Sequence, residues 1–305
     1  MKQLKIACIG EAMIEMIANA DTSNAQLGVA GDSMNTAIYL KRSLGPEHEV
    51  AFVSMVGQDA FSDRIADFIA GEGVSTELLK RHPSRLPGLY SISTSDTGER
   101  SFSYWRDSSA AKMMFTAQDG VKFDELNGFD VVFASAISLA ILSQQVRDEL
   151  FDWVSKFRST GGTFVFDSNY RPALWPDVQT AQREISRAWS HCDIALPSID
   201  DEVALYDDEN EENLIARFRN YGVTSGVMKR GDLGPISLSK NAIPLPVYAK
   251  AKNVVDTTAA GDSFNGGFLA SFLTTKNVEQ AAKAGHDLAS HVVSHRGAIV
   301  PRNVR

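Results

Sequence analysis

The chain has 305 residues, 44% of them hydrophobic and 22% charged, which fits a globular protein with one large domain and room for a small accessory unit. Its formal net charge of −8 argues against a general nucleic-acid or membrane-surface binder, because such proteins usually present a basic face. Cys8 and Cys192 lie in or beside apolar runs and predict reduced thiols in a cytoplasmic protein. We expect no signal peptide, since Glu11 ends the first apolar run.

Short apolar runs alternate with amphipathic stretches along most of the chain. The runs predict strands at Ile6–Ile9, Val50–Val53, Val131–Ala134, Thr163–Asp167, Ile194–Leu196, Gly226–Lys229 and Ile236–Leu238. The stretches predict helices at Asn35–Leu44, Phe61–Glu72, Leu142–Ser159, Thr180–His191 and Glu211–Tyr221. This alternation indicates an α/β fold with a mostly parallel central sheet, in which ligands bind at the carboxyl ends of the strands.

Two segments depart from this pattern because polar residues alternate in them with apolar or aromatic ones. They are Met13–Ile17 and Gly88–Arg106, and the second predicts a hairpin with a polar turn. We therefore place a small β lid at residues 11–31 and 85–110. The rest of the chain, residues 1–10, 32–84 and 111–305, is predicted to form a large α/β domain that binds nucleotide and substrate.

Residues 256–268 carry the clearest chemical signal. They follow the apolar run Asn253–Val255, which we expect to be a strand, and lead into a predicted helix at Phe268–Leu273. Small residues at the mouth of a helix leave backbone N–H groups free to face an anion, and the helix dipole favours negative charge there; here the small residues are Ala259, Ala260 and Gly261.

Asp262 is an unusual neighbour for such donors, since its charge repels a phosphate that is only bound. The carboxylate has a purpose if it takes a proton from a hydroxyl that attacks the phosphate. The segment therefore predicts an anion hole and a general base together, which indicates phosphoryl transfer to an alcohol.

The same segment resembles the C-terminal signature of the ribokinase/PfkB-type carbohydrate kinases, Asp-Thr-x-Gly/Ala-Ala-Gly-Asp. Gly28–Ala37 resembles the sugar-binding signature of that family, and Val56–Asp59 matches its Gly-x-Asp element. The similarity extends from Ile6 to Pro301. It implies a ribokinase-like three-layer α/β/α fold with a small β-sheet lid, ATP as the phosphoryl donor and Mg²⁺ as the metal.

Further segments look like the 2-keto-3-deoxygluconate kinases of this family, namely Gly31–Asn35, Tyr104–Arg106, Asp167–Pro172 and Leu196–Glu202. The resemblance implies substrate contacts by Gly31, Asp32, Asn35, Tyr90, Tyr104, Arg106 and Arg171. It implies nucleotide contacts by Asn169, Ser198, Lys229, Gly231, Gly234 and Gly261. Many members have Asn-x-x-Glu where this chain has Ser198 and Asp201, so we expect Asp201 to reach the metal only through water.

The chemistry of the two arginines supports the narrower assignment. Arg106 and Arg171 are planar donors suited to a carboxylate, which a sugar acid has and ribose or fructose lacks. Structural alternatives stay open for Arg106 as a strand-end charge, Arg171 as a surface ion pair, Tyr90 as a packing residue, and Asp32 and Asn35 as caps of a helix starting near Thr36. His286, His291 and His295 fit a helix surface or the wall of an adenine pocket better than a zinc site.

We therefore expect ATP-dependent phosphorylation of the primary hydroxyl of 2-keto-3-deoxygluconate to give 2-keto-3-deoxy-6-phosphogluconate, with Asp262 as the general base. A fructokinase or ribokinase-type sugar kinase is the enzymatic alternative. A sugar-sensing protein on a kinase fold is the non-enzymatic one, against which the intact Asp262 argues. The resemblance and the apolar hairpin also predict a homodimer formed through the β lid.

Overall fold

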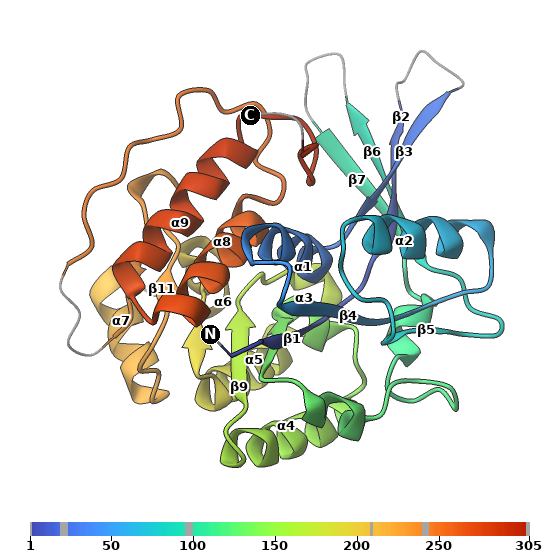
Figure 1. Cartoon of the computed structure of the whole chain (residues 1–305), viewed down its shortest axis with the longest axis horizontal. Helices are drawn as coiled ribbons and strands as arrows, with labels where there is room; N and C mark the ends of the chain where they lie inside the picture. The colour runs from blue at the N-terminus through green and yellow to red at the C-terminus, as the bar shows by residue number, and fades with distance from the viewer. Residues whose placement is uncertain (1, 19–23, 95–99, 208–209, 240–243, 303–305) are drawn as a thin grey trace.

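Six parallel strands form the central sheet, in the order β10-β9-β8-β1-β4-β5 (Figure 1). The strands are β1 (Lys5–Ile9), β4 (Glu49–Val56), β5 (Leu79–Arg81), β8 (Val131–Ser135), β9 (Thr163–Asp167) and β10 (Ile194–Ala195). A computed structural model describes residues 2–18, 24–94, 100–207, 210–239 and 244–302 of the protein. Because β1 pairs with β4 on one side and with the later β8 on the other, the chain reverses direction across the sheet at β1, and the crevice beside β1 is where such sheets bind ligands.

Helices cover both faces of this sheet, so the predicted three-layer α/β/α architecture is confirmed. The helices are α1 (Asp32–Ser43), α2 (Ala60–Gly71), α3 (Ala136–Ala140), α4 (Gln144–Ser159), α5 (Val178–His191), α6 (Ile199–Tyr206), α7 (Glu211–Asn220), α8 (Ala260–Thr275) and α9 (Val278–Val292). Five of the predicted helices lie within about one turn of these bounds, whereas α8 begins eight residues before the predicted start at Phe268.

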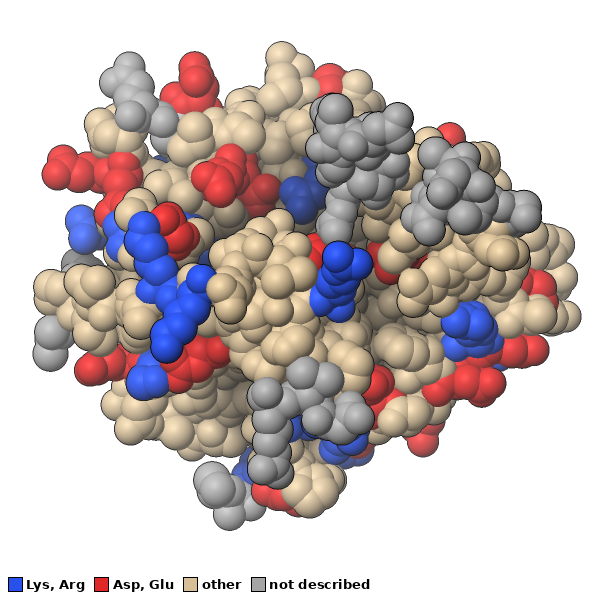
Figure 2. Space-filling model, turned by 90° about the horizontal axis from the view of Figure 1, so that it is seen from above, with Lys and Arg blue, Asp and Glu red and all other residues tan. Residues whose placement is uncertain are grey.

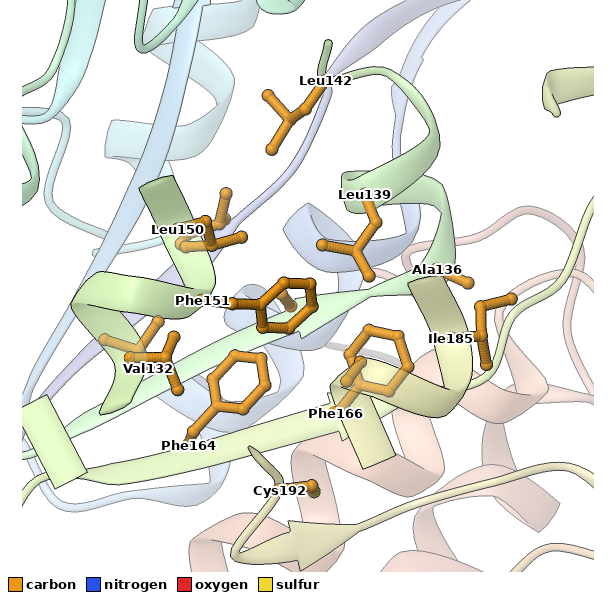
Figure 3. Close-up of a cluster of buried hydrophobic side chains, with 14 of the residues drawn as sticks. Val132, Ala136, Leu139, Leu142, Leu150, Phe151, Phe164, Phe166, Ile185 and Cys192 are labelled. Atoms are coloured by element: carbon orange, nitrogen blue, oxygen red, sulfur yellow. The ribbon is translucent and has the colours of Figure 1, made fainter. Parts of the chain in front are cut away.

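Two hydrophobic cores hold the layers together, and neighbouring residues of each strand point into opposite cores. On one face Phe164 and Phe166 of β9 pack with Phe151 of α4 and Ile185 of α5, as Figure 3 shows. On the other face Phe133 of β8 joins residues of α1 and α8. Fully burying a side chain of this size is worth roughly 1.5–3 kcal/mol, so each core contributes substantially to stability.

A second sheet stands apart from the first, at the upper right of Figure 1, and has the order β3-β2-β6-β7. Its strands are β2 (Met13–Ala18), β3 (Ala25–Ala30), β6 (Gly88–Thr94) and β7 (Arg100–Trp105). The pairing of β6 with β7 is antiparallel, which confirms the predicted hairpin; its turn at residues 95–99 lies outside the described part. All four strands fall within the segments predicted to form the small β unit.

The two faces of the small sheet have different surroundings. Ile14, Val29 and Leu89 belong to or pack against the core that contains α2. The opposite face carries Tyr90 and Tyr104, whose ring centroids are 5.7 Å apart. This second face is open, since 54% of Tyr104 is exposed.

Two predicted elements near the C-terminal half differ from expectation. Asn253–Val255 is not a strand: Val254 is 62% exposed, and the segment is fixed instead by a bond from the Val255 amide to the Val293 carbonyl. β11 (Val227–Met228) and β12 (Ile236–Ser237) form a separate antiparallel pair rather than strands of the central sheet. Single bridges from Ala195 to Gly226 and from Ser198 to Lys229 place this pair next to β10.

Candidate active site

Residues 256–259, the first part of the segment that predicts phosphoryl transfer, form a tight turn that leads into α8; we call this the phosphoryl-transfer turn. Asp256 shapes the turn by accepting bonds from the Thr258 amide at 3.0 Å and the Gly297 amide at 3.1 Å. Ala259, the residue before the helix, adopts a left-handed conformation with φ of 60°. The Ala260 amide already donates to the Thr257 carbonyl at 3.1 Å, which leaves the amides of Gly261 and Asp262 at the helix start as the donors for an anion.

Asp262 faces α1, where Asn35 donates a hydrogen bond from Nδ2 to Asp262 Oδ2 at 2.8 Å. Burial, followed by the nearby carboxylates of Asp32 and Asp167, raises the pKa of Asp262 well above its ordinary value. The bond from Asn35 and the charge of Lys229 act in the opposite direction and lower that pKa. A carboxylate with a raised pKa is a stronger base, as proton abstraction from a hydroxyl requires.

The sugar-binding signature lies at the start of α1, beside the crevice next to β1. Asp32 and Asn35 lie within the first turn of the helix rather than before it, and neither caps it, because Gly31 occupies the cap position without a side-chain bond. Gly31 is required here by close packing, since a Cβ at this position would lie 2.1 Å from the Glu11 carbonyl oxygen.

Asp32 connects α1 to the ends of two central strands. Its Oδ2 accepts bonds from Ser135 Oγ at 2.5 Å and from Asn169 Nδ2 at 2.9 Å. Ser135 ends β8 and Asn169 follows β9, so the network spans the carboxyl edge of the sheet. Asn169, predicted to contact the nucleotide, is thus held on the sugar-binding signature by Asp32.

Lys229 points toward the centre of this edge. Its Nζ donates to Asp167 Oδ1 at 2.6 Å and to Asn265 Oδ1 at 3.1 Å, and Asn265 Nδ2 donates to Asp167 Oδ2 at 3.0 Å. The three side chains form a closed triangle that joins β9, the turn after β11, and α8. Within that turn, Gly231 and Gly234 have φ of 54° and 77°, conformations that favour glycine.

Segments that flank the small sheet contribute a second polar group. Arg106 Nη2 donates to a carboxylate oxygen of Glu11, and the two residues are 7% and 1% exposed. Tyr90 donates from its hydroxyl to Glu15 on the paired strand. Tyr90 is therefore both packed and hydrogen-bonded, and Arg106 is a buried ion pair rather than a solvated strand-end charge.

Asp201 and Arg171 form the outer polar group. Arg171 Nη1 lies 3.3 Å from Asp201 Oδ1, and its side chain is 54% exposed, so the ion-pair alternative for Arg171 is observed. Ser168 Oγ donates to Asp201 Oδ2 at 3.0 Å and accepts from the Ser198 amide at 2.8 Å. Burial and Asp167 raise the pKa of Asp201, whereas Arg171 lowers it.

Glu202, adjacent to Asp201, is fully buried and has a different role. Its carboxylate accepts from Arg217 Nη1 at 2.9 Å and from Trp189 Nε1 at 3.1 Å. Burial raises the pKa of Glu202 to about 7. This residue fastens α6 to its neighbours and does not face the polar edge of the sheet.

A groove of about 710 Å³ lies between residues 246–253 and the C-terminal half of α9. Tyr248 stacks on His286 with ring centroids 4.9 Å apart, and Lys250, Lys252 and Lys283 line the rim. The flat rings and apolar walls suit a planar base, and the lysines suit phosphate. His286, one of the residues that the sequence offered as a helix surface or the wall of an adenine pocket, lines this groove.

The sequence predicted no role for four residues that bond to the predicted site residues: Glu11, Glu15, Asp167 and Asn265. Glu11 and Asp167 stand at the carboxyl ends of the predicted strands at Ile6–Ile9 and Thr163–Asp167, which is where ligand groups gather in such sheets. Glu15 pairs in register with Tyr90 and so shares its face of the small sheet. Asn265 lies one helical turn after Asp262.

Comparison with known proteins agrees with this geometry. The 2-dehydro-3-deoxygluconokinase of Escherichia coli strain K12 is 42% identical over 303 residues, which are 98% of this chain and 97% of that protein. The enzyme of the same name from Dickeya dadantii strain 3937 is 39% identical over 307 residues, 99% of this chain and 98% of that protein.

The fold is also found among solved structures. A putative ribokinase II from E. coli, determined in complex with ATP and Mg²⁺, matches with a TM-score of 0.81 and 24% identity over 97% of this chain and 94% of that one. Residues 3–304 match the pfkB family of carbohydrate kinases. The chain therefore belongs to the pfkB family of carbohydrate kinases.

Proposed function

We propose that the protein transfers the γ-phosphoryl group of ATP to the primary hydroxyl of 2-keto-3-deoxygluconate, also called 2-dehydro-3-deoxygluconate, to give 2-keto-3-deoxy-6-phosphogluconate. The assignment of the substrate is supported by two kinases named for this sugar acid, which are 42% and 39% identical to the chain over nearly its full length. The single structural observation that carries the proposal is the contact of Asp262 with Asn35, because it places the phosphoryl-transfer turn against the sugar-binding signature.

In the proposed reaction Asp262 accepts the proton of the substrate hydroxyl. The hydroxyl oxygen of the substrate forms a bond to the γ-phosphorus of ATP, and the bond between the γ-phosphorus and the β-phosphate oxygen breaks. The amides of Gly261 and Asp262 at the start of α8 stabilise charge on the transferred phosphoryl oxygens. Ala259 and Ala260 keep the turn narrow, so the backbone can approach the phosphate. Asn35 orients the carboxylate through its 2.8 Å bond.

The substrate is bound between α1 and the small sheet in this proposal. Asn35 Oδ1 is buried and has no partner among the described residues, which suits an acceptor for a sugar hydroxyl. Asp32 and the Gly31 backbone complete the hydroxyl-binding side. Arg106 also has an unpartnered buried donor, Nε, so its guanidinium can bind a substrate carboxylate while Glu11 holds the other end.

The outer polar group completes the substrate side. The exposed head of Arg171 is a second guanidinium for the acid. Tyr104 and Tyr90 supply aromatic surface on the open face of the small sheet. We assign residues 11–31 and 85–110 the role of a lid that excludes water, which would otherwise compete as a phosphoryl acceptor.

ATP is assigned to the groove beside α9 and to the turn that contains Gly231 and Gly234. Within the described residues no cluster of three or more His, Cys, Asp or Glu side chains could hold a metal alone. This fits Mg²⁺, which keeps several waters and binds through one or two carboxylates plus substrate phosphates. Asp201, which is 18% exposed and is joined through Ser168 to the Ser198 amide, is the carboxylate assigned to the ion through water, and the ion would neutralise phosphate charge.

The assembly and location of the protein are also part of this proposal. We assign a homodimer in which the open aromatic faces of two small sheets pack together, since Phe102 and Tyr104 are 49% and 54% exposed there. None of the helices in the described ranges is long and apolar enough to cross a bilayer. Both cysteines are buried free thiols, which supports a cytoplasmic setting. Figure 2 shows acidic and basic side chains interspersed on the face it displays, with no uniformly basic field for nucleic acid.

The direct test is product identification. Incubation with ATP, Mg²⁺ and 2-keto-3-deoxygluconate is followed by ³¹P and ¹³C NMR, with Asp262→Asn as the matched control. A phosphate ester on C6 that forms with wild type and is lost with the variant is the expected result. ATP consumption without ester formation, or an ester at another carbon, would overturn the proposal.

A further inference from the structure

The triangle formed by Lys229, Asp167 and Asn265 is an enclosed charged group at the carboxyl edge of the central sheet. The side chains of Lys229 and Asp167 are 11% and 4% exposed, and Asn265 is fully buried. A buried ion pair adds little net stability, because the desolvation cost offsets the attraction between the charges. We therefore consider a role for this pair in the reaction. The resemblance implied a nucleotide contact for Lys229, but its ammonium group donates to Asp167 and Asn265.

The ammonium group of Lys229 lies directly beside the phosphoryl-transfer turn. A Cβ built on Gly261 would be 3.6 Å from Lys229 Nζ, and Gly261 is the residue before Asp262. Asn265, which accepts from the same ammonium, lies one turn after Asp262 on α8. Charges so close act strongly on each other here, because the surroundings are partly shielded from water.

The charged and titratable groups around Asp262 come from several elements. Asp32 and Tyr39 face it from α1, Asp167 from the end of β9, and Lys229 from the turn after β11. In this set three groups are acidic and Lys229 is basic. Burial, Asp32 and Asp167 raise the pKa of Asp262, and Lys229 opposes them. Without an opposing positive charge, Asp262 would stay protonated, and so unable to act as a base, up to a higher pH.

We propose that Lys229 is a positioning residue that keeps the Asp262 carboxylate ionised under working conditions, and that Asp167 and Asn265 hold its ammonium group beside the turn. The inference rests on the proposed role of Asp262 as the base. The proton of the substrate hydroxyl goes to Asp262, and Lys229 changes only how readily Asp262 accepts it.

The two partners of the ion pair should act on Asp262 with opposite signs. Lys229→Met removes a positive charge and leaves Asp167 uncompensated, so the pKa of Asp262 rises and the acid limb of the kcat profile moves to higher pH. Asp167→Asn removes a negative charge and leaves Lys229 in place, so the limb moves to lower pH. Each displacement should be about one pH unit, and the double variant should lie near wild type.

The experiment is a set of kcat–pH profiles with both substrates saturating, for wild type, the two single variants and the double variant. The titration of ATP is common to all four and cancels in the comparison. Lys80→Met, which breaks an exposed pair with Glu125 at 2.8 Å, is the control for loss of a lysine and should leave the limb unchanged. A purely structural role would lower activity at every pH without displacing the limbs in opposite directions.

Limbs that stay in place, or that move the same way in both single variants, would overturn the inference. If Lys229→Met does not fold, Asp167→Asn and the charge-preserving Lys229→Arg still decide it: the first should move the limb down and the second should leave it near wild type. Asp262→Asn separates this inference from the proposed function. If the Asp262→Asn variant is active, Asp262 is not the base, and the proposed mechanism is wrong. If that variant is inactive but the acid limbs of the Lys229 and Asp167 variants do not move, only the role of Lys229 is contradicted.

Discussion

Asn35 on α1 and Asp262 on α8 are joined by a hydrogen bond of 2.8 Å although 227 residues separate them in the chain. The bond is reinforced by Thr36 Oγ1, which donates to the backbone carbonyl of Asp262 at 3.3 Å. The two helices therefore carry the sugar-binding signature and the phosphoryl-transfer turn as one unit. Displacing either helix would separate the groups proposed to bind the sugar hydroxyls from Asp262, the proposed base.

Asn35→Ala should weaken catalysis more than stability. The variant loses a hydrogen bond to a charged group, worth about 1.5–3 kcal/mol, so kcat/KM for the sugar acid should fall roughly 10- to 150-fold. Steady-state kinetics of ADP release measures this loss. Asn127→Ala is the control, because its side chain accepts from Trp153 and donates to Asp124, so it also loses a bond to a carboxylate, but Asn127 precedes β8 at the opposite end of the sheet. Equal kinetic losses in the two variants would contradict the role of Asn35.

Asp262→Asn should retain the fold while losing a factor of roughly 10² to 10⁴ or more in kcat, since the amide cannot accept the proton. Thermal unfolding should occur at or above the wild-type temperature, because burial and neighbouring acids make the Asp262 charge unfavourable. Turnover close to that of wild type would remove Asp262 from the proposed role.

Arg106→Ala should harm the sugar acid more than a neutral ketose. The Arg106 guanidinium can donate to a substrate carboxylate only when the substrate has one. A charged hydrogen bond is worth about 1.5–3 kcal/mol, so kcat/KM for the sugar acid should fall roughly 10- to 150-fold. The variant also leaves Glu11 buried without its partner, which lowers stability, so the informative quantity is the ratio of kcat/KM for the two substrates. If the ratio of kcat/KM for the two substrates is unchanged, Arg106 does not bind the substrate carboxylate.

Gly31→Ala should disturb sugar binding through sterics alone. The new Cβ would lie 2.1 Å from the Glu11 carbonyl oxygen, so the backbone at the start of α1 must move. Asp32 and Asn35 move with it, and KM for the sugar acid should rise while KM for ATP stays close to wild type. A rise confined to ATP would place this segment on the nucleotide side.

The sequence predicted the layers, most helices and the small sheet, because period-2 and period-3.6 patterns in this chain are long and regular. It did not predict that Asn253–Val255 would lack a strand, since a run as short as Val254 and Val255 looks the same whether it pairs with a strand or is held by the Val293 carbonyl. β11 and β12 were found as segments, but their pairing with each other depends on tertiary contacts.

For the site, short motifs located Asp262, Asp32, Asn35 and the glycine turn. Glu11, Asp167 and Asn265 had no predicted role, although Asp167 and Asn265 lie inside the segments that carry the resemblance, and only the fold brings the three to Arg106 and Lys229. The pairing of distant side chains is thus what the sequence could not supply. For Lys229, which the resemblance predicted to contact the nucleotide, the structure shows bonds to Asp167 and Asn265 instead.

The central claim is that this kinase acts on a sugar acid, and a coupled ADP-release assay on a panel of acceptors tests it most directly. The panel is 2-keto-3-deoxygluconate, 2-keto-3-deoxygalactonate, fructose and ribose, each with saturating ATP and Mg²⁺. The account predicts the highest kcat/KM for 2-keto-3-deoxygluconate, at least tenfold above either neutral sugar if one charged hydrogen bond to the carboxylate adds about 1.5 kcal/mol. A kcat/KM for fructose or ribose that equals or exceeds the value for the sugar acid would contradict it.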